Sequence, residues 1–288
     1  MRVLILGTTG LIGRMLFTYL SLYSNNSIYG ISRTKYFHPN ESINLSITPF
    51  DFFTDTKKIS NLLDSINPQV IINCAGITKH LSEINDTKRV EYMNRILPQN
   101  LSLICKQRNV RLIQVSTDCV FSGVKGGYTE LDKPDGEGIY STSKFAGEID
   151  EPHLTVRIST VGPELNTKYG LLAWFMSCED KCYGFRNAFF NGITSLEFSK
   201  IMNDIILPSP HLQGLFHISS NRISKYNLLR LFSIVLGKKI FIEANKTFIV
   251  DRTLSSTKFS LETNYIPKKF SKQLIELKQF LKEHTLYD

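Results

Sequence analysis

Hydrophobic and polar positions alternate in blocks along about the first 160 residues of the chain. Short apolar runs have the length expected of strands covered on both faces, and the longer stretches between them carry apolar residues at helical spacing. The predicted strands are 2–6, 27–32, 46–50, 70–74 and 111–116, and the predicted helices are 13–23, 56–66 and 87–108, the last with a kink at Pro98. Strand and helix repeated with short links predict an α/β fold, a Rossmann-like doubly wound parallel sheet with right-handed crossovers.

The regular alternation weakens after Arg157. Helices are expected over 170–178, 196–207, 225–236 and 270–283, with short strands near Leu215 and Phe241. No Ser/Gly-rich linker separates the two halves, so a second domain should pack directly on the first. We expect a dinucleotide-binding domain over residues 1–162, to which short later segments return, and a smaller, mainly helical substrate-binding domain over residues 163–288.

A glycine-rich run, Gly-Thr-Thr-Gly-Leu-Ile-Gly over residues 7–13, joins the first strand to the first helix. Glycines at this spacing allow a tight turn and close backbone approach, and the helix N-terminus offers amide donors to a pyrophosphate. Such a run could be a simple turn, but it has the strand-turn-helix context that dinucleotide binding requires. The cofactor contacts expected here are Gly7, Thr9, Gly10, Leu11 and Ile12.

The end of the second strand indicates which dinucleotide binds. An acidic residue about 20 residues after the glycines would favour NAD, but Ser32 and Arg33 stand there, followed by Thr34 and Lys35. A guanidinium suits the extra 2′-phosphate of NADP because it binds phosphate through two parallel hydrogen bonds. We therefore favour NADP(H), with NAD(H) as the alternative if Arg33 is only a solvated loop charge.

Tyr140 and Lys144 lie four residues apart, so on a helix they share one face. The pKa of a free tyrosine is about 10, and a neighbouring ammonium is expected to lower it. Such a phenol can donate a proton to a carbonyl oxygen while hydride reaches the carbonyl carbon. This spacing is common on surface helices, but here it follows a strand that ends in Ser116 and Thr117, and strand ends line the crevice of this architecture.

With these runs, the chain resembles an extended short-chain dehydrogenase/reductase, and within that group the dTDP-4-dehydrorhamnose reductase family. The resemblance covers nearly the whole length, and the Ser-Thr-Asp…Phe-x-Gly run over 116–123 is its most specific part. The other matching runs are residues 7–13, 73–76, Asn94 with Pro98, Tyr140 to Glu148, 157–159, 214–217 and 251–258.

The resemblance implies a role for each matching residue. Thr117 would hydrogen-bond the substrate carbonyl, Tyr140 would donate the proton, and Lys144 would hold the nicotinamide ribose. Asn94 would support the lysine through the helix or a water molecule. The implied cofactor contacts are Ala75, Gly76 and Ile158 on the nicotinamide side, Asp51 and Phe52 on the adenine side, and Tyr140 and Lys144. The implied substrate contacts are Thr117, Asp118, Tyr140 and Trp174, although Trp174 could equally be a core residue.

Two positions depart from the family pattern. Cys119 stands where relatives often have Tyr, and Ser141 follows the catalytic Tyr where Gly is frequent. The acidic residues that bind Mg²⁺ at the dimer interface of some members have no counterpart that we can place, so we assign no metal site and leave a homodimer open.

The function that this resemblance implies is NAD(P)H-dependent reduction of a nucleotide-activated 4-keto-6-deoxy sugar for polysaccharide or O-antigen synthesis. Alternatives are another extended-type reductase or epimerase acting on a nucleotide sugar. A third alternative is a non-catalytic regulatory subunit, since some relatives regulate other enzymes, including methionine adenosyltransferase.

Composition excludes several other classes. A hydrophobic content of 42% with 21% charged residues is ordinary for a globular protein, so disorder is not expected. The net charge of +8 comes from scattered lysines and arginines, so no nucleic-acid partner is expected. The N-terminal apolar run is too short for a signal peptide or a membrane span, which predicts a cytoplasmic protein with no membrane partner. The five cysteines are predicted to be free thiols.

Overall fold

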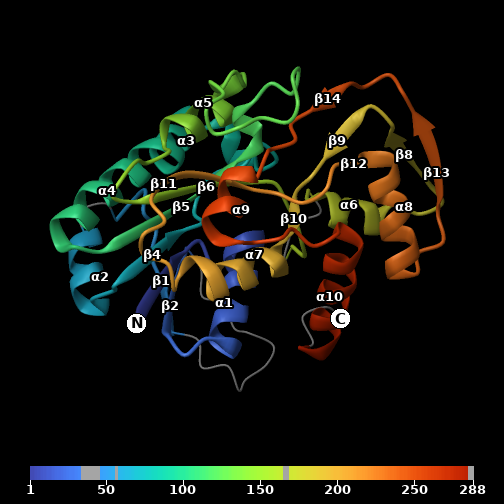
Figure 1. Ribbon diagram of the computed structural model, residues 1–288. Helices are drawn as coiled ribbons and strands as arrows, with labels where there is room; N and C mark the ends of the chain where they lie inside the picture. Colours follow the sequence, from blue (N-terminus) through green and yellow to red (C-terminus); the bar gives the residue numbers. More distant parts are fainter. Residues whose placement is uncertain (34–45, 56–57, 165–168, 285–288) are drawn as a thin grey trace.

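A seven-stranded parallel sheet forms the centre of the computed structural model (Figure 1), which describes residues 1–33, 46–55, 58–164 and 169–284. Its strand order is β11-β6-β5-β4-β1-β2-β3, and every neighbouring pair is parallel. The strands are β1 (Arg2–Leu6), β2 (Ser27–Ser32), β3 (Ser46–Pro49), β4 (Val70–Asn73), β5 (Arg111–Thr117), β6 (Leu154–Ile158) and β11 (Gly214–Ile218). The strand order reverses between β1 and β4, so the prediction of a doubly wound Rossmann-like sheet is confirmed.

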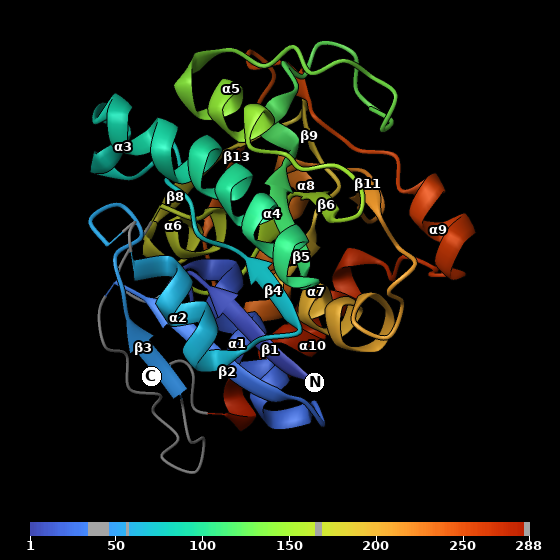
Figure 2. The same ribbon diagram turned by 90° about the vertical axis from the view of Figure 1, so that its left-hand side faces the viewer.

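Helices cover both faces of this sheet (Figures 1 and 2). One face packs against α1 (Leu11–Tyr23), α7 (Ser195–Ile201), the π-helical segment η5 (Met202–Ile206) and α9 (Thr257–Thr263). The other face packs against α2 (Ile59–Ile66), α3 (Thr87–Glu91), the π-helical segment η3 (Tyr92–Ile96), α4 (Leu97–Arg108) and α5 (Gly138–Ala146). Two short 3-10 turns, η2 (Ser82–Asn85) and η4 (Asp118–Val120), follow β4 and β5.

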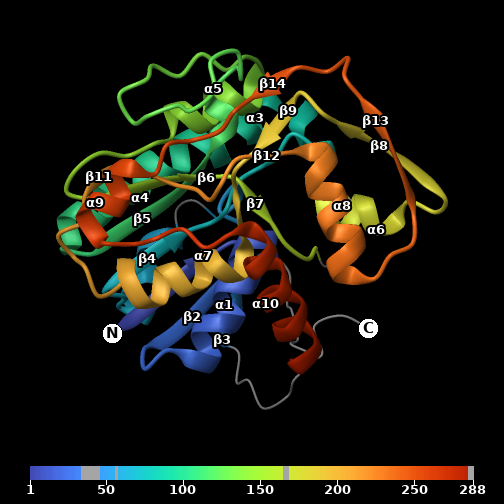
Figure 3. The ribbon, with the colours of Figure 1, turned by 45° about the vertical axis from the view of Figure 1, so that its right-hand side comes forward.

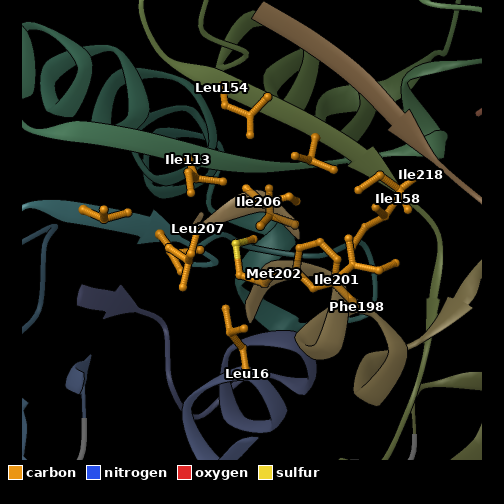
Figure 4. Packing of buried hydrophobic residues seen from close by; sticks show 14 of the residues in the cluster. Leu16, Ile113, Leu154, Ile158, Phe198, Ile201, Met202, Ile206, Leu207 and Ile218 are labelled. Atoms are coloured by element: carbon orange, nitrogen blue, oxygen red, sulfur yellow. The ribbon is translucent and has the colours of Figure 1, made fainter. Parts of the chain in front are cut away.

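The continuous apolar run in β1 serves both helix layers. Val3 and Ile5 belong to the cluster around α1 and α7, whereas Leu4 and Leu6 belong to the opposite cluster, and all four are fully buried. This division follows from the two-residue period of a strand, which turns successive side chains to opposite faces. Figure 4 shows the first cluster, in which Leu16 and neighbouring helical side chains meet the sheet.

The predicted helix over 87–108 is interrupted. Residues 92–96 form a π-helical turn, in which the backbone N–H of Leu97 reaches back to the carbonyl of Tyr92. Pro98 lies in the first turn of α4, directly after this π-helical turn in a helix that continues from α3, so it cannot donate to the preceding turn. The irregularity therefore lies immediately before the proline, close to the predicted kink. Residues 56 and 57 of another predicted helix lie outside the described residues, and α2 begins at Ile59.

The later part of the chain combines helices with short strands (Figure 3). The helices are α6 (Leu171–Ser177), α8 (Lys225–Leu236) and α10 (Phe270–Glu283), and the strands are β7 (Thr160–Val161), β8 (Lys181–Phe185), β9 (Ala188–Phe190), β10 (Ile193–Thr194), β12 (Ile223–Ser224), β13 (Phe241–Asn245) and β14 (Val250–Asp251). A separate apolar cluster, which includes Phe175, Phe232, Phe270 and Leu274, joins α6, α8 and α10. Meanwhile β11, α7 and α9 pack on the large sheet. No helix in the described part of the chain is long and apolar enough to cross a membrane.

The core packing yields a stability prediction. Leu16 is fully buried on α1, whereas Leu103 on α4 exposes 63% of its surface. We expect Leu16→Ala to lower the free energy of unfolding by about 2–5 kcal/mol through lost burial and a residual cavity. Leu103→Ala should change it by about 0.5 kcal/mol or less. Denaturant titration of both variants measures the difference, and equal destabilisation would contradict the burial assigned to Leu16.

Candidate active site

The glycine turn after β1 is held tightly against two neighbouring strands. The backbone N–H groups of Gly7 and Thr8 both donate to the carbonyl of Ile31 at the end of β2. Gly7 has a φ of +82°, and a Cβ at this position would lie 2.8 Å from the backbone nitrogen of Ala75. A Cβ at Gly13 would lie 2.3 Å from the Gly7 carbonyl oxygen. A side chain at either position would push the glycine turn away from the backbone that it contacts, so the packing of this turn requires glycine.

The N-terminus of α1 opens from this turn. Gly10 is its exposed N-cap residue, with no side-chain cap and no acidic residue in the first turn of the helix. The 13-residue helix therefore presents unoccupied amide donors and a partial positive charge, which suit an anion. Thr9, Leu11 and Ile12 border this end and are only partly buried. A pyrophosphate is the anion that the sequence predicts for this cradle.

The residues predicted to contact the adenosine of the cofactor differ in their burial and in their partners. Ser32 is buried at the end of β2, and Arg33 is exposed and forms an ion pair with Glu83 of η2, with 3.1 Å between Nη1 and Oε1. Asp51 accepts a hydrogen bond from Arg89 at 2.8 Å. The ring of Phe52 packs in the core against Phe50. Arg33 thus has an acidic partner in addition to the surrounding solvent. Thr34 and Lys35 lie outside the described residues.

The end of β5 and the start of α5 bring together the predicted catalytic hydroxyls. Thr117 Oγ1 accepts from the backbone N–H of Cys119 at 3.1 Å and donates to Asp118 Oδ1 at 3.2 Å. Thr117 also acts on the phenol of Tyr140, where it opposes the rise in the pKa of that group. A substrate carbonyl placed between them would face two hydroxyl groups, which is the arrangement that oriented proton donation needs.

Lys144 is buried one helical turn beyond Tyr140. Its Nζ donates to the carbonyl oxygen of Val115 in β5 at 2.8 Å. The pKa of Lys144 is lowered to about 8 by burial, and Glu148 and Cys74 partly oppose this lowering. A Cβ at Gly76 would lie 3.9 Å from this Nζ, so the chain after β4 passes close to the ammonium.

The pKa of Tyr140 differs from the sequence expectation. Burial raises it well above its ordinary value, Cys119 adds to the rise, and the hydrogen bond with Thr117 only partly opposes it. The expected lowering by Lys144 is wrong for this structure, since the ammonium is bound to the Val115 carbonyl. At neutral pH the phenol is therefore protonated and able to donate.

Asn94 lies in the π-helical segment and joins two parts of the site. Its side chain accepts from the backbone N–H of Ile77 at 2.8 Å and donates to the Ile77 carbonyl at 2.9 Å. It also donates to Ser143 Oγ at 3.2 Å, next to Lys144 on α5. A Cβ at Gly147 would lie 1.8 Å from the Asn94 carbonyl oxygen. Asn94 thus reaches the helix of Lys144 through Ser143. The π turn places its side chain there, as such turns often do at functional sites.

The predicted substrate side contains cations that the sequence did not single out. Burial raises the pKa of Asp118, while hydrogen bonds from Ser159 and Thr117 and the charges of Arg252 and Lys79 lower it. Burial lowers the pKa of Lys225, and Lys79 and Arg252 act on it in the same direction. These lysines come from segments far apart in the sequence, so no local pattern indicates that they converge.

Two other predicted residues are placed individually. Trp174 lies on α6 with 38% of its surface exposed, while Leu172 and Phe175 of the same helix are buried. It is therefore not a core residue, and its contact with a substrate stays a prediction. Ile158 ends β6 and is buried. Within the described residues, no three His, Cys, Asp or Glu side chains are grouped as metal ligands.

Comparison with known families agrees with this geometry. The sequence pattern of the RmlD substrate binding domain matches residues 1–166, which is more than half of the chain.

Three curated relatives match parts of the chain. A probable low-salt glycan biosynthesis reductase of Haloferax volcanii is 32% identical over 114 residues, 38% of this chain and 38% of that protein. The dTDP-4-dehydrorhamnose reductase of Mycobacterium tuberculosis is 40% identical over 85 residues, 27% of this chain and 28% of that protein. Methionine adenosyltransferase 2 subunit beta of Rattus norvegicus is 29% identical over 147 residues, 51% of this chain and 41% of that protein. The match thus spans less than half the length of each relative.

Solved structures match over nearly the whole chain. A dTDP-4-dehydrorhamnose reductase from Clostridium acetobutylicum has a TM-score of 0.78 at 19% identity, with 98% of this chain and 100% of that chain covered. That of Bacillus anthracis, in complex with NADP, has a TM-score of 0.75 at 19% identity and coverages of 97% and 99%. A dTDP-glucose 4,6-dehydratase of Bacillus anthracis, in complex with NAD, has a TM-score of 0.78 at 19% identity and coverages of 100% and 98%. At such identities the likeness shows the fold alone, whereas the predicted family resemblance is confirmed by the match of the RmlD substrate binding domain over residues 1–166.

The glycine turn gives a prediction with a matched control inside the same turn. Gly13→Ala should lower the free energy of unfolding by about 1–3 kcal/mol, because its Cβ would overlap the Gly7 carbonyl. In Gly10→Ala the new Cβ would lie 3.4 Å from that oxygen, so the cost should be about 1 kcal/mol or less. Denaturant unfolding of the two variants tests this order, which equal losses would refute.

Proposed function

Because this chain belongs to the RmlD substrate-binding domain family, we propose that it is an NAD(P)H-dependent reductase of a nucleotide-activated 4-keto-6-deoxy sugar, acting in polysaccharide or O-antigen sugar synthesis. The observation that carries the proposal is the convergence of Thr117, Tyr140 and the buried Lys144, whose Nζ donates to the Val115 carbonyl at 2.8 Å two residues before Thr117. The three side chains lie at the carboxyl end of β5, next to the switch point where this architecture binds ligands.

The backbone around the glycine turn supports dinucleotide binding. The cradle formed by Gly7, Gly13 and Ala75 has no room for side chains, and the N-terminus of α1 offers donors to a pyrophosphate. Gly76 and Ile158 would border the nicotinamide, and Asp51 the adenine. A bound nicotinamide cofactor supplies the hydride.

The side chains of this chain supply the proton. Tyr140 is protonated at neutral pH, as a tyrosine with the ordinary pKa of about 10 would also be, so it can donate in the direction of reduction. Its raised pKa makes it a weaker acid than a free tyrosine, and Thr117 opposes that rise and would orient the substrate carbonyl. Lys144 is bound to the Val115 carbonyl in this structure, so we assign its ammonium to the nicotinamide ribose.

The charges near Asp118 support an anionic substrate. Lys79 and Arg252 both act on the carboxyl of Asp118 and on the ammonium of Lys225, so three cations influence this part of the site. A nucleotide sugar carries a diphosphate that such a set of cations attracts. The nucleotide-sugar reductases among the relatives agree with this substrate class. Another extended-type reductase or epimerase would use the same charges, so the particular sugar is decided only by assay.

A non-catalytic regulatory subunit is the second candidate, because the chain also matches the beta subunit of methionine adenosyltransferase 2. A regulatory subunit could retain the nucleotide cradle without turnover. Consumption of NADPH with a keto-sugar nucleotide separates the two functions.

The proton donor can be tested by removing one hydroxyl group. Tyr140→Phe should lower turnover of a keto-sugar nucleotide by about 10² to 10⁴, the range for a lost general acid, while folding and cofactor binding stay nearly intact. Lys144→Ala should lower turnover and also weaken cofactor binding, since the lysine would serve both. Thr117→Val should cost less than Tyr140→Phe, because it removes one orienting hydrogen bond. Wild-type turnover in Tyr140→Phe would end the assignment of this residue.

The ion pair between Arg33 and Glu83 gives a test of cofactor choice. We expect NADPH to bind at least about tenfold more tightly than NADH, since a hydrogen bond to a charged group is worth about 1.5–3 kcal/mol. Arg33→Ala should reduce this gap. Glu83→Gln removes the partner of Arg33 but keeps the guanidinium, so the gap should persist or widen. Titrations of both cofactors measure it, and equal NADPH and NADH affinities in the wild type would show that Arg33 does not read the 2′-phosphate.

A further inference from the structure

Glu148 lies just beyond the C-terminus of α5, where its carboxylate accepts three hydrogen bonds. Oε1 accepts from Ser116 Oγ at 2.6 Å and from Arg157 Nε at 2.7 Å, and Oε2 accepts from Arg157 Nη2 at 2.6 Å. Arg157 is 2% exposed, so this is a two-point ion pair inside the protein. None of the roles proposed above uses it.

The Glu148–Arg157 ion pair contacts β5 one residue after the position that Lys144 contacts. Lys144 Nζ binds the carbonyl of Val115, and Glu148 binds the hydroxyl of the next residue, Ser116. The residue after that is Thr117, which acts on the phenol of Tyr140. One strand end therefore carries the ammonium, the carboxylate and the substrate-orienting hydroxyl at three successive positions.

We propose that Glu148 is a positioning residue that keeps the buried ammonium of Lys144 charged and fixes the end of β5 that carries Thr117. The catalytic consequence rests on the proposed reductase function. The electrostatic effect on Lys144 belongs to the protein itself.

The groups facing Lys144 leave Glu148 as its counter-charge. Two groups in the described part of the chain raise the pKa of Lys144 against burial, namely Glu148 and Cys74 at the end of β4. Burial raises the pKa of the Cys74 thiol to about 12, so that group is uncharged at neutral pH. Asn94 and Gly76 carry no charge, and Tyr140 is protonated. Glu148 is therefore the ionised group that offsets the desolvation of the lysine.

Arg157 keeps Glu148 in place and is itself enclosed by uncharged groups. Its Nη1 donates to Nε2 of His217 at 3.2 Å, and its guanidinium lies 5.1 Å from the centre of the Phe121 ring. Because a guanidinium only donates, Nε2 accepts, and Nδ1 donates to the carbonyl of Tyr128 at 3.1 Å. Burial, reinforced by Arg157, lowers the pKa of His217 to about 3, so this imidazole is neutral. Glu148 thus lies between two buried cations.

Titration of Lys144 in the cofactor-free protein tests the proposal directly. With lysine labelled by ¹³C at Cε, the Lys144 resonance is identified by its absence from Lys144→Gln. In the wild type we expect it to titrate near the pKa of about 8 that burial gives. In Glu148→Gln the midpoint should fall by about one pH unit, because a nearby opposite charge has been removed. Glu148→Asp keeps the charge and should remain closer to wild type.

Two further variants keep the test decisive. Glu148→Gln leaves Arg157 buried without a partner and can prevent folding, so the double variant Glu148→Gln/Arg157→Met removes both charges. Its Lys144 midpoint should fall less than in Glu148→Gln, because removal of the Arg157 charge acts in the opposite direction. Asp64→Asn, which removes a carboxylate paired with Arg108 on the surface of α2, should leave the Lys144 midpoint unchanged. An unchanged midpoint in both Glu148 variants that lack the carboxylate would overturn the proposal.

Kinetics then separates this inference from the proposed function. If the wild type reduces a keto-sugar nucleotide, the decline of kcat at alkaline pH should begin at lower pH in the double variant. A merely structural role of Glu148 would lower kcat without changing the pH at which this decline begins. Absence of turnover in the wild type with any keto-sugar nucleotide would refute the reductase but leave the lysine titration valid. Turnover with an unmoved Lys144 midpoint would refute the role of Glu148 alone.

Discussion

The contact between the glycine turn after β1 and the chain after β4 is the constraint on which the rest of the site depends. Hypothetical Cβ atoms at Gly7 and Gly13 would overlap the backbone of Ala75 and Gly7. Because the strand order reverses between β1 and β4, this contact lies where ligand crevices form in doubly wound sheets. The same sheet edge carries the end of β5, so sheet topology alone places the candidate phosphate cradle next to the candidate proton donor.

A second constraint is the buried lysine next to that contact. Desolvation disfavours the ammonium of Lys144, and the Val115 carbonyl and the Glu148 carboxylate offset this cost. The helix carrying the lysine also packs so closely on Asn94 that Gly147 has no room for a side chain. Strongly perturbed ionisable groups cluster at functional sites. The buried ammonium therefore marks the end of β5 as a candidate functional site, whether the chain catalyses a reaction or only binds a nucleotide.

Sequence patterns predicted the large sheet well because buried parallel strands are short apolar runs, as in residues 2–6. They missed the π-helical turn at 92–96, since a single wider turn barely changes the spacing of apolar residues. Spacing placed Tyr140 and Lys144 on one face but carried no information on burial or on the competing Val115 carbonyl, so the direction of the tyrosine pKa was wrong. Partners of Arg33 and Arg157 come from other elements, and no local pattern reveals them.

The fold brings some of the scattered basic residues of the chain close to the candidate site. Scattered lysines and arginines gave no nucleic-acid pattern in the sequence, yet Lys79, Lys225 and Arg252 act together around Asp118. Cations with low-dielectric walls behind them focus their field into the adjoining crevice, which raises the local concentration of an anionic ligand. Asp118 interacts with these cations, and Arg252 also acts on Asp135. Asp118 directly follows Thr117, so these charges act near the end of β5, where the proposed anionic substrate would have to arrive.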